Sequence, residues 1–173
     1  MFLIKKSVLL IIPSKNFNEE EFLIIKTAIE KAEVNVFIAS DSNFLCIGSN
    51  GLKIKSDVQF YNIHESNFAG LILIGGSGMR EYWNNKVIQS VSKRFALSKK
   101  PVGAICSAPV ILARAGLLSD GATCYPDDKV ELEREGVNYE DIAVVAKKNI
   151  ITAKNPASSN EFVKAFLYEL GKR

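Results

Sequence analysis

Short apolar runs alternate with helical hydrophobic patterns along this 173-residue chain. Runs of Val, Ile and Leu with almost no polar interruption are typical of strands buried on both faces, and therefore of a parallel sheet. The expected strands are Val8–Ile12, Val34–Ala39, Leu71–Ile74, Val102–Ile105 and Ile142–Ala146. Because parallel strands need crossover connections, the helical segments between these strands predict an α/β sandwich with right-handed crossovers.

Four helices are expected between and after these strands. The first carries an apolar face with helical spacing, made of Phe22, Ile25, Ile29 and Ala32. The others are expected at about 80–97, 108–115 and 160–170. Ser158 and Glu161 form a capping-box pattern before the last helix, and Gly171 marks its end.

Two antiparallel hairpins are expected as additions to the parallel core. Residues 44–47 and 52–55 flank the turn sequence Gly48-Ser49-Asn50-Gly51, and residues 144–145 and 150–151 flank Lys147-Lys148-Asn149. No repeat, linker or low-complexity segment interrupts the pattern. Residues 1–173 are therefore expected to form a single domain.

Composition excludes several classes of protein and partner. A content of 47% hydrophobic and 24% charged residues is that of a folded globular chain rather than a disordered one. The net charge is only +3 and the Lys and Arg residues are scattered in pairs, so we expect no nucleic-acid partner. No apolar run approaches the length of about 20 residues that spans a membrane, so we expect no membrane partner.

The chain has only three cysteines and one histidine, which limits the metal sites and disulfides that it could form. The cysteines have no metal-ligand spacing and His64 stands alone, so no metal site is expected. An odd cysteine count without a signal peptide indicates a reducing, cytoplasmic setting. The glycine cluster Gly75-Gly76-Ser77-Gly78 follows a buried strand but matches no nucleotide-binding fingerprint, so no cofactor is expected and a tight strand-to-helix turn is the plainer interpretation.

Cys106 lies where a buried strand passes directly into a helix that begins near Pro109. Its small neighbours tolerate a cramped turn, which is the layout of a nucleophile elbow. A helix N-terminus favours thiolate over thiol, so we expect the pKa of Cys106 to be lowered. The alternative is a small buried core residue; Cys46 and Cys124 lie in strand-like runs and fit that description better than Cys106 does.

A nucleophile needs a partner that takes or gives a proton. His64 lies in a polar stretch before the third strand, at the opposite end of the sheet, and is expected to be a surface residue. Glu21 lies at the end of the sheet where the strands have their carboxyl ends, which is the end where ligands bind in such sheets. With Asn18 it also forms a capping-box pattern, and Phe17 with Phe22 forms a hydrophobic staple. Capping and catalysis are compatible only if the Glu21 side chain turns inward rather than back to the Asn18 amide.

With these residues in view, the chain resembles the ThiJ/PfpI family, which includes the parkinsonism-associated protein deglycase and intracellular peptidases and belongs to the class I glutamine amidotransferase-like superfamily. The resemblance extends from Val8 to Leu170. The segments that carry it are Val102–Leu118, Ala122-Thr123-Cys124-Tyr125-Pro126, Leu73-Ile74-Gly75-Gly76, Glu81-Tyr82-Trp83 and Asn155-Pro156-Ala157.

The resemblance implies a flavodoxin-like three-layer sandwich with a reactive cysteine at the elbow, matched by Cys106. It implies an acidic partner on the first helix, matched by Glu21, which favours catalysis over capping. The family's oxyanion site of backbone N–H groups matches Gly76 and Ser107, with Gly75 as an accessory position. Self-association into homodimers or larger homo-oligomers is implied as well.

Two departures from the family pattern affect the expected activity. Ser107 stands where the peptidase branch has histidine, and Tyr125 stands where the deglycase branch has histidine. Amide hydrolysis needs both a base and an acid, so an intracellular peptidase or amidase is the weakest reading. A thiolate adding to a small reactive carbonyl, as in a glyoxalase or deglycase, needs only Cys106, N–H groups and Glu21 as proton shuttle, with Tyr125 as a possible hydrogen-bonding substitute. A redox-responsive stress protein without turnover, working by cysteine oxidation, is the alternative.

Overall fold

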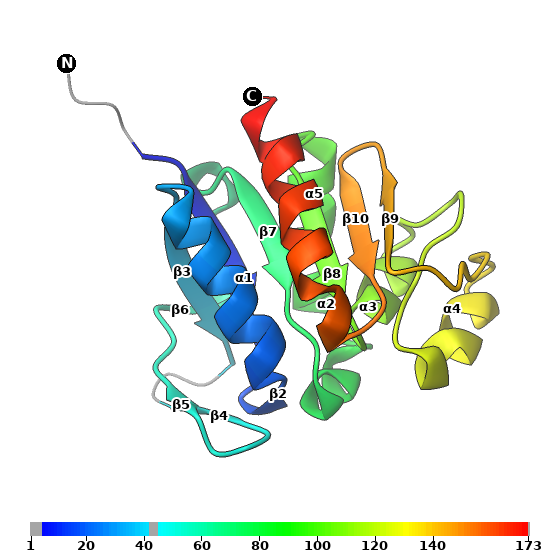
Figure 1. The fold of residues 1–173 in the computed structure, drawn as a ribbon, viewed down its shortest axis with the longest axis horizontal. Coiled ribbons are helices and arrows are strands. Elements are labelled where there is room, and N and C mark those ends of the chain that lie inside the picture. Colours follow the sequence, from blue (N-terminus) through cyan, green and yellow to red (C-terminus); the bar gives the residue numbers. More distant parts are fainter. Residues whose placement is uncertain (1–4, 42–44, 173) are drawn as a thin grey trace.

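The computed structural model describes residues 5–41 and 45–172, and their elements lie in three layers (Figure 1). The middle layer is a seven-stranded sheet in the order β6-β3-β1-β7-β8-β10-β9. Its strands are β1 (Ser7–Ile11), β3 (Asn35–Ser40), β6 (Val58–Gln59), β7 (Gly70–Leu73), β8 (Val102–Ile105), β9 (Val144–Lys147) and β10 (Ile150–Ala153). All neighbours in it pair in parallel except β9 and β10, which are antiparallel. The predicted α/β sandwich is therefore confirmed.

The strand order determines where a ligand can bind. The inner strands β3-β1-β7-β8-β10 follow the order 2-1-3-4-5 of a flavodoxin-like sheet. The direction of chain progression reverses between β1 and β7, and ligands of such sheets bind beyond the carboxyl ends of the strands at that point. The segments that follow β1, β7 and β8 all meet at this edge.

Helices cover both faces of the sheet (Figure 1). Helices α1 (Glu19–Lys31) and α5 (Ser159–Gly171) lie on one face, and α2 (Lys86–Leu97) and α3 (Pro109–Arg114) lie on the other. Alternate residues of β1 enter the two cores: Leu10 packs with Phe22 and Phe166, whereas Leu9 packs with Phe95. This two-sided burial explains why the strands read as nearly unbroken apolar runs. The short helix α4 (Lys129–Arg134) packs near α3 at the edge.

Residues before α1 fix the start of that helix. Oδ1 of Asn18 accepts a hydrogen bond of 3.0 Å from the N–H of Glu21, and the Phe17 and Phe22 ring centroids lie 5.4 Å apart. Asn18 is therefore the N-cap of α1, and the predicted staple is confirmed. The N–H of Asn18 donates to the carbonyl of Gly75 at 3.0 Å, so the Glu21 side chain does not complete a capping box.

Two predicted hairpins are present, but one lies elsewhere than expected. The β9–β10 hairpin extends the main sheet. Strands β4 (Cys46–Gly48) and β5 (Lys53–Ile54) pair antiparallel, yet they form a separate three-stranded sheet with β2 (Lys15–Phe17). The carboxylate of Glu19 holds this hairpin against α1, because its Oε1 accepts from the N–H groups of Asn50 and Leu52 at 2.7 and 2.8 Å. Phe44, at the start of the predicted hairpin, lies outside the described residues.

Other expectations are corrected by side-chain hydrogen bonds. The helix expected at 80–97 is divided into a 3-10 segment, Ser77–Tyr82, and α2, because Oδ1 of Asn85 caps α2 by accepting from Val87 and Ile88 at 3.0 and 3.1 Å. The Ser158–Glu161 capping box is absent, since Ser158 Oγ bonds Asn155 instead.

Two segments expected to be strands are corrected as well. The strand expected from Ile142 begins only at Val144, and Ile142 is half exposed beside the antiparallel edge. Cys124 is buried as expected, but in an irregular segment rather than a strand. Among the described helices, none is both long enough and apolar enough to cross a bilayer.

The approach of the Ser77–Tyr82 segment to β2 gives a test of the packing beneath the site. A Cβ on Gly78 would lie 1.8 Å from the carbonyl oxygen of Lys15, so Gly78→Ala forces two backbone segments apart. We expect this substitution to lower the free energy of unfolding by about 3 kcal/mol, measured by urea denaturation. Gly171→Ala is the control, because a Cβ there meets no atom within 4 Å. Equal stability of Gly78→Ala and the unmodified chain would contradict the described packing.

Candidate active site

Three segments of the chain bring the predicted site residues together beyond the carboxyl ends of the strands. Glu21 lies in the first turn of α1, Gly75 and Gly76 follow β7, and Cys106 follows β8. A cavity of about 340 Å³ opens above them. It is lined by Asn18, Gly76, Ser77, Arg80, Cys106, Ser107, Tyr125 and Pro156.

Cys106 occupies a strained backbone position between β8 and α3. Its φ is 61°, in the left-handed region that residues with a Cβ rarely adopt. Both backbone groups are held, since its N–H donates to Ala153 at 2.9 Å and its carbonyl accepts from Tyr125 at 2.8 Å. The turn leaves the side chain 5% exposed, at the wall of the cavity. This is the geometry of a nucleophile elbow.

Glu21 points inward beneath the sulfur. Its side chain is fully buried, its Oε2 accepts a hydrogen bond of 2.8 Å from the N–H of Gly75, and the carboxyl lies beside the Cys106 thiol, with which it interacts electrostatically. Its Oε1 has no hydrogen-bond partner among the described residues. Burial raises the pKa of Glu21 from 4.5 to about 7, against the opposing effect of the Gly75 N–H. The backbone of Glu21 thus belongs to the helix cap, and its side chain belongs to the site.

The expectation of a lowered thiol pKa is wrong for this structure. Burial raises the pKa of Cys106 above its ordinary value, and the negative charge of Glu21 raises it further. Hydrogen bonds from the Gly76 N–H and from Ser107 oppose the shift but are smaller. Helix α3 has only six residues, so its dipole is weak. The resting site therefore holds a thiol next to a carboxyl group that is half ionised near neutral pH.

The glycine pair gives the loop after β7 its close approach to the sulfur. A Cβ on Gly75 would lie 2.5 Å from Cβ of Cys106, and a Cβ on Gly76 would lie 2.4 Å from the carbonyl oxygen of Asn16. Gly76 also has a φ of 112°, which a side chain would strain. The N–H of Gly76 consequently faces the Cys106 sulfur, to which it donates.

Ser107 is the second predicted oxyanion position. Its N–H makes no backbone hydrogen bond within residues 5–41 and 45–172, and the residue lines the cavity. Its carbonyl accepts a hydrogen bond of 2.7 Å from the indole N–H of Trp83, which fixes the orientation of this turn. Gly76 and Ser107 thus place two backbone N–H groups on the rim of one cavity.

Arg80 is a site residue that the sequence reasoning missed. It lines the cavity, its guanidinium lies 5.9 Å from the centroid of the Tyr125 ring, and it forms an ion pair with Asp128. The signals were an arginine four residues after Gly76 and an aspartate three residues after Tyr125. His64 is exposed and precedes the amino end of β7, away from Cys106, as expected.

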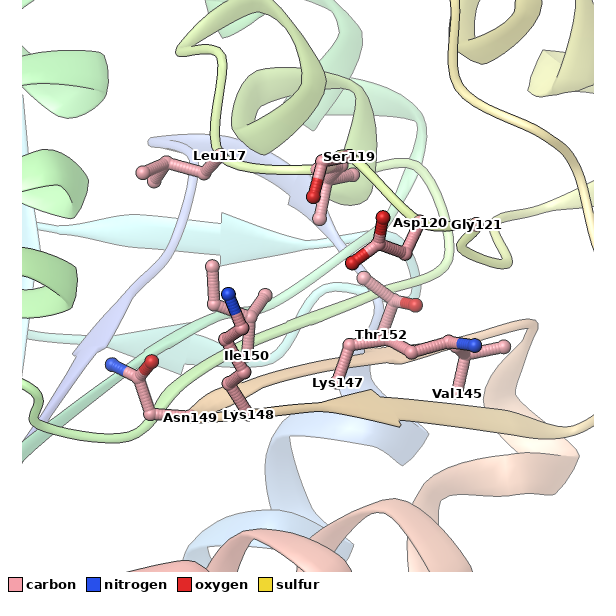
Figure 2. A pocket seen from close by; sticks show the side chains of 11 residues that line it. Leu117, Ser119, Asp120, Gly121, Val145, Lys147, Lys148, Asn149, Ile150 and Thr152 are labelled. Carbon is pink, nitrogen blue, oxygen red and sulfur yellow. The ribbon is translucent and has the colours of Figure 1, made fainter.

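Figure 2 shows a second cavity, of about 100 Å³, between the loop Leu117–Gly121 and the β9–β10 hairpin. Lys147, Lys148 and Asn149 line it from the hairpin, and no cysteine or histidine is among its lining residues. It therefore holds neither a thiol nor an imidazole base. Among the described residues, no cluster of His, Cys, Asp and Glu could hold a metal ion.

The buried carboxyl gives a pH-dependent stability. A carboxyl with a raised pKa in the folded state stabilises the fold fully below about pH 4.5, and this contribution is lost as the pH rises through about 7. We expect the free energy of unfolding of the unmodified chain to fall, relative to Glu21→Gln, by up to about 3 kcal/mol between roughly pH 4 and pH 8. Urea titrations across this range measure it. A difference between the two proteins that stays constant with pH would contradict the raised pKa.

The chain is similar to proteins of one known family. The model of the DJ-1/PfpI family matches residues 6–169. An uncharacterised protein from Methanocaldococcus jannaschii is 37% identical over 153 residues, covering 86% of this chain and 75% of that protein. A glutathione-independent glyoxalase from Caenorhabditis elegans and a deglycase from Pyrococcus horikoshii are each 27% identical, covering 91% of this chain and 85% and 96% of their own lengths.

Solved structures show the same fold. A ThiJ/PfpI domain protein from Brachyspira murdochii superposes with a TM-score of 0.94 at 27% identity, covering 98% of this chain and 99% of that one. Schizosaccharomyces pombe DJ-1 superposes with a TM-score of 0.85 at 22% identity, covering 98% and 96%. From the family match over residues 6–169 together with this fold, the chain belongs to the DJ-1/PfpI family.

Proposed function

We propose that this chain is a cysteine-dependent enzyme of small reactive carbonyl compounds, of the glyoxalase or deglycase type. The observation that carries the proposal is the contact between the Cys106 thiol and the buried Glu21 carboxyl, at the wall of a cavity rimmed by the N–H groups of Gly76 and Ser107. The relatives named as a glyoxalase and a deglycase support an activity of this class.

The raised pKa values of Glu21 and Cys106 indicate which of the two groups holds the proton at each step of the proposed reaction. With the pKa of Glu21 at about 7, both protonation states are well populated near neutral pH, which suits a group that must accept and return a proton. The Glu21 carboxylate takes the thiol proton as the sulfur attacks the aldehyde carbon. The former carbonyl oxygen gains the electron pair, is stabilised by the N–H groups of Gly76 and Ser107, and receives the proton from Glu21. The product is a hemithioacetal on Cys106.

The same carboxylate can complete a glyoxalase reaction on a 2-oxoaldehyde. It removes the proton from the hemithioacetal carbon, which gives an enediol as the neighbouring carbonyl oxygen is protonated, and it returns the proton to the neighbouring carbon. The hemithioacetal hydroxyl loses its proton in the same isomerisation, so that the adduct becomes a thioester with a 2-hydroxyl group and no proton is gained or lost overall. Water then hydrolyses the thioester, so that the aldehyde plus one water become a 2-hydroxy acid and free Cys106. No further side-chain base is needed in this scheme, which accommodates Ser107 and Tyr125 in place of histidine.

Removing either member of the pair tests the proposal. We expect Cys106→Ser to abolish methylglyoxal consumption and Glu21→Gln to reduce it by roughly 100-fold or more, since a positioned proton-transfer group contributes about that factor. Proton NMR follows the loss of methylglyoxal and the appearance of lactate. His64→Ala is the control, because this exposed residue lies outside the site. Consumption by Cys106→Ser at the rate of the unmodified chain would refute the proposal.

A redox-responsive role is the second candidate, and the Glu21 contact favours it too. A protonated carboxyl beside the sulfur can donate a hydrogen bond to an oxygen of a sulfinic acid and so stabilise it. Cys46 and Cys124 are fully buried and lack such a partner, since Cys46 bonds Ser40 and the Cys124 sulfur contacts the carbonyl of Tyr125.

Mild peroxide treatment followed by peptide mass spectrometry tests this candidate. We expect Cys106 to gain oxygen atoms before the other two cysteines, and to accumulate less sulfinic acid in Glu21→Ala. Oxidation of Cys46 or Cys124 ahead of Cys106 would count against a sensing role.

A further inference from the structure

Arg80 gives the cavity a feature that the proposed chemistry does not use. Among the residues that line the cavity, it is the only one with a charged side chain at neutral pH, apart from any thiolate formed on Cys106. A glyoxal-type carbonyl group is neutral and would be bound by the N–H groups of Gly76 and Ser107 alone. The guanidinium therefore places a positive charge in the cavity wall that binding a neutral carbonyl group does not require.

The guanidinium is held in a fixed orientation. Its Nε donates to Oδ1 of Asp128 at 2.9 Å, and its Nη2 lies 2.9 Å from the same oxygen. Its central carbon also lies 5.9 Å from the centroid of the Tyr125 ring, within the range of a cation–π interaction. Nη1 makes no hydrogen bond in the described part of the chain, so it remains available to a ligand. An oriented arginine loses less entropy on binding an anion than a flexible one does.

The two members of this ion pair are not equally accessible. The Asp128 side chain is 5% exposed, whereas the Arg80 side chain is 40% exposed. A ligand in the cavity therefore meets the cation, and the carboxylate that balances its charge lies behind it. This arrangement permits charge-assisted hydrogen bonds to an anion although the pair is neutral overall.

We propose that the preferred substrates of this site are reactive carbonyl compounds that carry a carboxylate, and that Arg80 binds the carboxylate while Cys106 attacks the carbonyl. The inference rests on the proposed function, of which it names the substrate class. The covalent step is unchanged: the S–H of Cys106 adds across the C=O bond, the sulfur bonds to carbon, and the proton reaches the oxygen through Glu21. Nothing else is consumed or released in this addition.

Two alkylating reagents of nearly equal size test the charge preference without a carbonyl. Iodoacetate carries a carboxylate and iodoacetamide does not, and peptide mass spectrometry measures how fast each labels Cys106. The ratio of the two rates is divided by the same ratio for N-acetylcysteine. We expect this normalised ratio to be about tenfold above one, the effect of a single charge-assisted hydrogen bond. A ratio at or below one would overturn the inference.

Variants distinguish the effect of the Arg80 guanidinium on the labelling ratio from the effect of the net charge of the cavity. Arg80→Gln leaves Asp128 unbalanced, so it should lower the ratio partly through repulsion. Arg80→Gln combined with Asp128→Asn keeps the net charge and should still lower the ratio about tenfold. Asp128→Asn alone should raise it. Arg134→Gln is the matched control, since its side chain is 67% exposed and pairs with Glu131 outside the cavity. Circular dichroism establishes that each variant is folded.

Protection by carbonyl compounds extends the test to the substrate class. We expect glyoxylate to protect Cys106 from iodoacetamide at a lower concentration than glyoxal does, and this difference to disappear in the double variant. Equal protection in all proteins would overturn the inference and leave the proposed function standing. Methylglyoxal turnover without Cys106 would overturn the proposed function instead. Labelling of Cys106 by neither reagent would overturn both, because the sulfur would then be unreachable.

Discussion

The hydrogen bond from the Gly75 N–H to the Glu21 carboxylate is the contact on which the site depends. It turns the Glu21 side chain away from the helix cap and beneath Cys106. It forms because the neighbouring Asn18 N–H is taken by the Gly75 carbonyl, so one glycine satisfies both the cap and the carboxyl. The loop after β7 therefore joins the first helix to the elbow, and the site is assembled from segments that follow three different strands.

Burial sets the chemistry of this assembly. It raises the pKa values of both Glu21 and Cys106, and the charge of Glu21 adds to the shift at the sulfur. Before any reaction, Cys106 is therefore a neutral thiol beside the Glu21 carboxyl group rather than a thiolate. In the proposed reaction, a single carboxyl that is half ionised near neutral pH takes the place of histidine, first as base and then as acid.

The sequence predicted the sheet and the elbow well because both follow from local pattern. Apolar runs identify strands covered on both faces, and the abrupt passage from β8 into Pro109 identifies the turn at Cys106. Contacts between distant segments were not predictable in this way. The separate small sheet depends on β2 pairing with the distant β4, and the raised thiol pKa depends on burial by residues from several segments. Arg80 was missed because only the folded chain brings it to Tyr125 and Asp128.

The proton chemistry of this site depends on Glu21, and not Cys106, titrating near neutral pH. Carbon-13 NMR of the chain labelled at the glutamate carboxyl carbons measures this directly, with Glu21→Gln identifying the signal. We expect the Glu21 resonance to titrate with a midpoint near pH 7, while the thiolate absorbance at about 240 nm stays absent through that range. A Glu21 midpoint near 4.5, together with a thiolate signal already present at neutral pH, would contradict it.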